Sequence, residues 1–293
     1  MDHAKEGEGS GSVRQAASGT NSAWTERSGK AKRHAVQKTA LAAVAHPDDI
    51  EFMMAGTMLL LKERGWDIHF WNLADGYLGT IDYGREEIIR IRAEEAVQSA
   101  NAAGAVAHPA LFGDLGIFYD APSLAVTASV LRLVRPSLIL THSPSDYMED
   151  HQNVCRLIVT AAFSRGMPNY ITTPPLAPWS DPVRIYHSLP HGLRDGLGRV
   201  VEPDLFVDIS ATIQKKKDLL ACHESQKNWL DASQGMGAYL EEMEGLCGAM
   251  GTMSGQFTHA EAFLRHNHLG FCPPDFDPLP AAISGLSIPN PKS

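Results

Sequence analysis

The sequence has few cysteines and little positive charge for its length. Lysine and arginine number 25 against 34 aspartates and glutamates, which gives a formal net charge of -9 over 293 residues. An acidic balance of this size argues against nucleic acid or an anionic membrane as the partner. The few cysteines form no Cys-x-x-Cys pair, so we expect free buried thiols and a reducing, cytoplasmic compartment rather than a disulfide framework. These cysteines are Cys155, Cys222, Cys247 and Cys272.

Long hydrophobic runs are also missing. No apolar segment reaches the length of a membrane span, and the first residues contain no hydrophobic core of a secretion signal. Residues 1–37 are rich in Gly, Ser, Ala and charge, and we expect a disordered leader there. Residues 272–293 are rich in proline and predict an extended tail. Residues 38–271 are then one domain, long enough to bury a full core.

Apolar runs of strand length alternate with helical patterns through residues 38–271. This alternation predicts an α/β fold, a Rossmann-like three-layer sandwich with a mostly parallel sheet. The expected strands cover residues 39–45, 67–74, 106–112, 137–142, 183–188 and 204–209. The expected helices cover residues 50–64, 86–103, 124–134, 151–163 and 211–223, with two short closing helices at 236–243 and 258–267.

The run Ala-His-Pro-Asp-Asp-Ile-Glu, residues 45–51, stands where the first expected strand meets the first expected helix. A nucleotide-binding module would place glycines there, because a phosphate must approach the helix N-terminus closely. The carboxylates of Asp48, Asp49 and Glu51 instead repel an anion and attract a cation. Helix capping explains one such acid but leaves the rest of the run unexplained.

A second acid–histidine motif, Thr-His-Ser-Pro-Ser-Asp-Tyr-Met-Glu-Asp-His at residues 141–151, follows the fourth expected strand. Ligands of such sheets gather at the carboxyl ends of the strands, so the two motifs are expected to meet. Two histidines and one aspartate, with open positions for water, form a common catalytic zinc shell. The second aspartate of the first motif can then take the proton of a metal-bound water.

These residues resemble the PIG-L/LmbE family of zinc-dependent N-deacetylases, over roughly residues 38–270. The resemblance implies that His46, Asp49 and His151 bind Zn²⁺, or another divalent metal that exchanges with it, and that Asp48 is the general base. It implies removal of an acetyl or other acyl group from the amide nitrogen of an N-acetylglucosamine-type sugar or glycoconjugate. It also implies a small-molecule partner and a homo-oligomer as one expected assembly.

Weaker matches extend the resemblance. Arg92, in Arg-Ala-Glu-Glu-Ala, and Asp114, in Leu-Phe-Gly-Asp-Leu-Gly-Ile, occupy positions that imply substrate binding. His223, in Cys-His-Glu-Ser-Gln, implies a catalytic histidine late in the fold. Asp150 precedes His151 and is expected to support that ligand. Ordinary roles stay open: an ion-paired helix arginine for Arg92, a turn residue for Asp114 and a structural histidine for His223.

One position departs from the family pattern. Better-known members read His-Pro-Asp-His at the second motif, where the first histidine stabilises the oxyanion or protonates the amine. Met148 stands there instead, and a thioether cannot donate a hydrogen bond. Either another group donates, or the protein binds metal and sugar without strong hydrolytic activity. His223 is the preferred substitute, ahead of four other candidates: Tyr147, His142, His187 and His191.

Overall fold

The computed structural model of the chain describes residues 38–228 and 238–290. The expected leader at residues 1–37 lies outside the described residues, as do the first two residues of the helix expected at 236–243. Within the described ranges, none of the helices is long and apolar enough to cross a membrane.

Among the described residues, eight strands form one sheet in the order β3-β2-β1-β4-β5-β7-β6-β8. The strands are β1 (Thr39–Val44), β2 (Asp67–Asn72), β3 (Val106–His108), β4 (Leu138–Thr141), β5 (Arg184–Ser188), β6 (Leu205–Asp208), β7 (Ala260–Arg265) and β8 (Ser287–Pro289). The first five pair in parallel, whereas β7, β6 and β8 extend the sheet by antiparallel pairing. The α/β prediction is confirmed, and the sheet is mostly parallel with an antiparallel edge.

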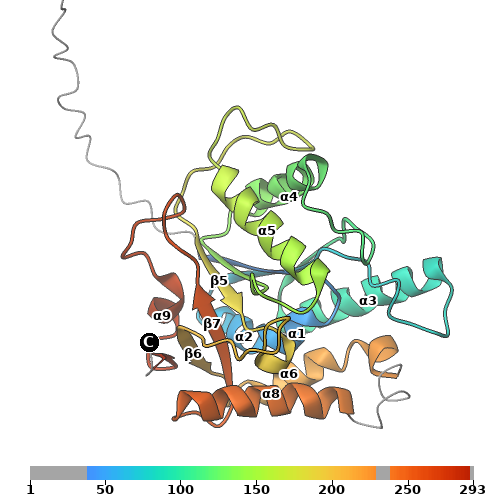
Figure 1. Cartoon of the computed structure of the whole chain (residues 1–293), viewed down its shortest axis with the longest axis vertical. Coiled ribbons are helices and arrows are strands. Elements are labelled where there is room, and N and C mark those ends of the chain that lie inside the picture. Colours follow the sequence, from blue (N-terminus) through green and yellow to red (C-terminus); the bar gives the residue numbers. More distant parts are fainter. Residues whose placement is uncertain (1–37, 229–237, 291–293) are drawn as a thin grey trace, which may run out of the picture. The chain divides into compact units, whose positions relative to one another are not determined.

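Helices cover both faces of the sheet (Figure 1). They are α1 (Asp49–Met53), α2 (Ala55–Glu63), α3 (Arg85–Ala103), α4 (Ala121–Val134), α5 (Glu149–Ser164), α6 (Ile213–Leu220), α8 (Ala238–Ser254) and α9 (Pro278–Ala282). Alternate side chains of β1 explain the three layers: Ala40, Ala42 and Val44 enter the core with α1, α2, α6 and α8. Leu41 and Ala43 enter the other core, with α4 and α5.

Three expected elements differ from the structure. The helix expected at 50–64 is two helices, because the backbone at Met54 leaves the helical region, with φ -149°. The helix expected at 258–267 is wrong, since this segment forms β7 between β5 and β6. Its Ala, Glu and Leu residues have helical propensity, but burial on both faces of the sheet overrides it. The expected tail is not simply extended, because it contains α9 and β8, which pairs with β6.

The carboxylate of Glu261, on the misassigned β7, holds the start of α2. Its two oxygens accept hydrogen bonds from the backbone N–H groups of Gly56 and Thr57, at 2.8 and 2.7 Å. The Lys216 ammonium donates to the same carboxylate at 2.6 Å, and both charged side chains are fully buried. A buried charge of this kind needs its partner, because removal of one member leaves the other uncompensated.

Glu261→Ala is therefore expected to lower the free energy of unfolding by about 3–5 kcal/mol. The substitution removes the carboxylate that pairs with the buried Lys216 charge and accepts hydrogen bonds from two N–H groups of α2. Glu94→Ala is the matched control, because Glu94 pairs with Arg90 on an exposed face of α3, and its loss costs at most about 1 kcal/mol. Denaturant titration of both variants measures the difference, and equal midpoints would refute the role given to Glu261.

Candidate active site

The ends of two neighbouring parallel strands bring the two acid–histidine motifs together. His46 follows β1, and Asp49 is the first residue of α1. His151 lies in the first turn of α5, ten residues beyond the end of β4, and β4 pairs directly with β1. Between them, Asp48 has a left-handed backbone, with φ 106°. That conformation is uncommon for a non-glycine residue and points the carboxylates of Asp48 and Asp49 to different partners.

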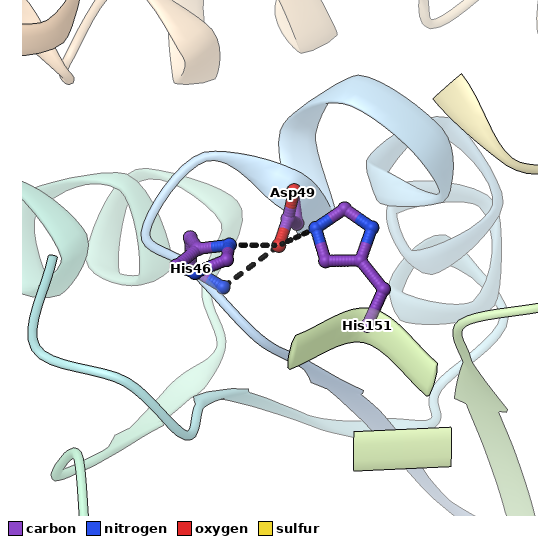
Figure 2. A group of neighbouring side chains, drawn as sticks. All are labelled: His46, Asp49 and His151. Carbon is purple, nitrogen blue, oxygen red and sulfur yellow. Dashed lines mark hydrogen bonds and ion pairs between the residues drawn. The ribbon is translucent and has the colours of Figure 1, made fainter. Parts of the chain in front are cut away.

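Asp49 lies between His46 and His151 (Figure 2). Its Oδ2 atom is 3.5 Å from His46 Nδ1 and 3.5 Å from His151 Nε2. The backbone N–H of His46 also donates to this oxygen at 2.7 Å, which fixes its position. Ligand atoms that share one tetrahedral zinc ion at about 2.0–2.2 Å stand roughly 3.3–3.6 Å apart. The spacing around Asp49 therefore fits a single metal ion.

The ring of His151 gives an independent test of this fit. The side chain is 4% exposed, and neither ring nitrogen makes a hydrogen bond within the described chain. Its Nδ1 lies 3.1 Å from Asp146 Oδ1, outside hydrogen-bond geometry, and its Nε2 faces Asp49. Buried polar atoms without partners are rare in folded proteins, and where they occur they indicate a bound ion or a functional role. Two histidines and a carboxylate suit zinc and other divalent transition metals.

A second cluster, His142, Asp146 and His151, has similar composition. The Nε2 atom of His142, however, accepts a hydrogen bond from the backbone N–H of Ala45 at 2.8 Å, so its lone pair is engaged. Burial, together with the charge of His151, lowers the pKa of His142 and favours its neutral form. Asp146 is better placed to orient His151 than to bind an ion of its own. The cluster with His46 and Asp49 is the stronger ligand set.

Electrostatics in the metal-free protein agree with a cation site. Burial lowers the pKa of His46, but the carboxylates of Asp150 and Asp49 outweigh it and raise that pKa to about 10. Burial likewise raises the pKa of Asp49, yet His151, His142 and His46 hold it well below its usual range. In this state protons supply the positive charge that the carboxylates require. A metal ion that binds here must displace them.

Asp48 lines the same cavity as this cluster, but its carboxylate has different partners. Its Oδ2 accepts a hydrogen bond from the Tyr239 hydroxyl at 2.8 Å and lies 3.6 Å from Arg92 Nη2. Burial raises the pKa of Asp48, and the Asp49 charge adds to this effect, while Arg92 and His223 oppose it. The net shift is upward, as a group that takes and returns a proton requires.

Arg92 and Asp114 line the same cavity, but their polar atoms mainly bind a loop. Arg92 is 3% exposed and donates from Nη1 to the Gly76 carbonyl and from Nη2 to the Pro47 carbonyl, at 3.0 and 2.6 Å. The Asp114 carboxylate accepts from the N–H groups of Gly76 and Leu78, at 2.8 and 2.9 Å. Gly76 has φ 76°, and a Cβ there would lie 2.6 Å from Arg92 Nη1, so the loop strongly favours glycine at this position. Direct substrate contact by either residue stays a prediction.

The structure does not bring His223 to the cavity. Its side chain is fully buried, does not line the cavity, and has Nε2 3.4 Å from Glu51 Oε2. The structure therefore does not support His223 as the donor that replaces the missing histidine. Asp150 is also placed differently from the expectation: its Oδ2 lies 3.1 Å from His46 Nε2 and accepts from the Leu115 N–H. It supports the ligand His46 rather than its sequence neighbour.

The cavity above these residues has a volume of about 490 Å³. Two of its lining residues, Tyr239 and Glu242, come from α8. No sequence motif indicated these two residues, because nearly 190 residues separate α8 from the first motif. Asp146 lies inside the second motif and was missed, although an acid five residues before a ligand histidine was a usable signal. Tyr147, Met148 and His191 also line the cavity.

The chain is similar in sequence to a deacetylase and to a hydratase. The diacetylchitobiose deacetylase of Thermococcus kodakarensis is 31% identical over 197 residues, which cover 64% of this chain and 70% of that protein. The 4-oxalmesaconate hydratase of Pseudomonas putida is 27% identical over 206 residues, which cover 66% of this chain and 75% of that protein.

Solved structures share the fold. The N,N'-diacetylchitobiose deacetylase of Pyrococcus horikoshii superposes with a TM-score of 0.67 at 21% identity, covering 83% of this chain and 88% of that chain. The 4-carboxy-2-hydroxymuconate hydratase of Pseudomonas putida superposes with a TM-score of 0.66 at 23% identity. The match covers 78% of this chain and 96% of that chain. At these identities the likeness establishes the architecture alone.

The family itself follows from the sequence matches. The profile described as "PIG-L: GlcNAc-PI de-N-acetylase" matches residues 41–162, a stretch that contains both acid–histidine motifs. The resemblance seen in the sequence is thereby confirmed, and the chain belongs to the PIG-L (GlcNAc-PI de-N-acetylase) family.

Proposed function

We propose that this chain is a zinc-dependent N-deacetylase that removes an acetyl group from the amide nitrogen of an N-acetylglucosamine-type sugar or glycoconjugate. The main support is the convergence of His46, Asp49 and His151 beside Asp48, with the ring nitrogens of His151 buried and without hydrogen bonds. Membership of a de-N-acetylase family and a relative that is named as a chitobiose deacetylase support this substrate class.

His46, Asp49 and His151 would coordinate the ion, and neighbouring carboxylates would orient the two histidine ligands. Asp150 faces the second ring nitrogen of His46, and Asp146 faces that of His151. Carboxylates in such positions orient a metal-bound imidazole and raise its basicity. When bound, zinc supplies a Lewis acid and lowers the pKa of water from 15.7 towards ~7.

Asp48 is the proposed proton carrier. It takes the proton of the attacking water and returns it to the nitrogen of the departing amine. The Tyr239 hydroxyl fixes the position of its Oδ2 atom, and Arg92 balances its charge after deprotonation. Because Tyr239 already donates to Asp48, its hydroxyl is engaged and does not serve as the oxyanion donor.

Tyr147 is the proposed replacement for the histidine that Met148 displaces. Its side chain lines the cavity, and its ring stands edge-on to the His151 ring at 5.8 Å between centroids. Partial burial and the carboxylates of Asp49 and Asp146 raise the pKa of its phenol, so the hydroxyl stays protonated and able to donate. Two other candidates line the cavity: His142, whose Nε2 accepts a hydrogen bond from the Ala45 N–H, and His191, which is 3.0 Å from Glu242.

A hydratase is the second candidate, because the 27% identical relative carries that activity in its name. Acetate release from N,N'-diacetylchitobiose by the metal-loaded protein tests the proposal directly. Hydration of 4-oxalmesaconate without acetate release would replace the proposal with the second candidate. Zinc and sugar binding without turnover of either compound would favour the non-hydrolytic alternative.

His151→Ala is expected to remove most of the bound metal from the purified protein, because it deletes one of three ligands. Elemental analysis after dialysis measures the metal per chain. His69→Ala is the control, since His69 lies on β2 and contacts His108 rather than the metal ligands. One full equivalent of metal in the His151→Ala protein would contradict the ligand assignment.

Asp48→Asn is expected to retain the metal and to lower turnover by ~10²-fold or more, since the amide cannot accept a proton. Tyr239→Phe, which removes only the hydrogen bond to Asp48, should lower turnover less. Metal content and acetate release are measured on both proteins. Near-normal turnover in a metal-replete Asp48→Asn protein would assign the proton transfer to another group.

Tyr147→Phe is expected to lower kcat by ~10²–10³-fold with little change in KM, as loss of one oxyanion donor does in other hydrolases. Met148→His should bring little gain if Tyr147 already supplies the donor. His223→Gln is the comparison, because His223 lies outside the cavity. A large gain from Met148→His together with no loss from Tyr147→Phe would indicate a site that lacks its donor.

A further inference from the structure

The walls of the catalytic cavity are acidic on several sides. Among the described residues that line it, six are aspartate or glutamate, one is arginine and none is lysine. The acids are Asp48, Asp49, Asp114, Asp146, Asp150 and Glu242. One divalent ion together with the arginine balances only half of these carboxylates. Low-dielectric walls concentrate the remaining negative potential in the cavity.

The single arginine is poorly placed to attract an anion. Both terminal nitrogens of Arg92 donate to backbone carbonyls, those of Gly76 and Pro47, and the guanidinium is 3% exposed. The carboxylate of Asp48, 3.6 Å from Nη2, opposes its charge. A phosphate that entered the cavity would therefore meet carboxylates before it met a free cation.

The mouth of the cavity contains one acid and several apolar side chains. Glu242, on α8, is 45% exposed, and its only hydrogen-bond partner among the described residues is His191 at 3.0 Å. Leu78, Leu115 and Tyr147 are 47%, 65% and 53% exposed and line the same cavity. Of the acids in the cavity, Glu242 is the one that an incoming substrate meets at the surface.

We infer that the cavity selects uncharged or cationic N-acyl sugars, that it disfavours sugars that carry phosphate or carboxylate, and that Glu242 determines this specificity at the mouth. The inference rests on the proposed deacetylase function. It narrows the substrate class within a family named for a phosphate-bearing glycolipid.

The test compares N-acetylglucosamine with N-acetylglucosamine 6-phosphate on the metal-loaded, full-length chain. Phosphate at the sixth carbon stands across the ring from the acetamide, so it does not compete directly for the metal. The neutral sugar is expected to have the higher kcat/KM. In Glu242→Lys the ratio of phosphorylated to neutral kcat/KM should rise by at least roughly sixfold, because the substitution changes the charge by two units, and each unit charge about 8 Å from the phosphate contributes roughly a factor of 2.4 under water-like screening.

Glu241→Lys is the matched control, because Glu241 is the exposed neighbour on the same helix and does not line the cavity. It adds the same charge and should leave the ratio unchanged.

Added salt gives a readout that needs no substitution. In the wild-type protein, added salt should raise kcat/KM for the phosphorylated sugar relative to the neutral one, because salt screens the repulsion between the phosphate and the carboxylates of the cavity.

Three results would overturn the inference: preference of wild type for the phosphorylated sugar, an equal rise in the ratio in Glu241→Lys and Glu242→Lys, or a fall in the ratio with salt. Absence of acetate release from both sugars and from N,N'-diacetylchitobiose would reject the proposed function instead. Both sugars then remain intact, and calorimetric titration of the metal-loaded protein compares their binding. Tighter binding of the phosphorylated sugar would in that case reject the inference as well.

Discussion

The left-handed backbone at Asp48 is the constraint on which the site depends. Two carboxylates that follow one another in sequence must serve different partners, and φ 106° turns Asp48 towards Tyr239 while Asp49 faces the two histidines. A non-glycine residue in this region of backbone space costs of order 1–3 kcal/mol. The surrounding contacts must therefore offset this cost and hold the backbone of Asp48 in place. The hydrogen bond from the His46 N–H to Asp49 and the bond from Tyr239 to Asp48 supply two of these contacts.

Buried charge connects this turn to segments that are distant in sequence. Arg92 of α3 contacts Asp48 and donates to the Pro47 carbonyl, while Tyr239 of α8 reaches the same carboxylate. Glu51 of α1 lies beside His223 and accepts a hydrogen bond from the Ser99 hydroxyl of α3. Each buried acid of the first motif thus depends on a group that another element supplies. The fold must form before the carboxylates can stay charged together.

The sequence predicted the parts of the site that are encoded locally. The motif after β1 and the motif after β4 predicted the candidate ligand set, and the structure places its members together because strand ends meet at one edge of a parallel sheet. Contacts between distant segments could not be read in this way. Tyr239 and Glu242 belong to a helix with no motif, and His223 faces Glu51, whose role within the first motif was not recognised. β7 was missed because Ala and Glu are common in helices, whereas burial beside β5 and β6 decides its conformation.

The same acidity that suits a cation site also makes the metal-free protein depend on protons. Asp49 and Asp150 surround His46 and raise its pKa to about 10, so the imidazole carries a positive charge at neutral pH when no metal is present. A divalent ion would take over this compensation and would join β1 and α1 to α5 through shared ligands. An ion that binds the folded chain and not the unfolded one also stabilises the fold. Metal binding and consolidation of the two strand ends would therefore be one physical event.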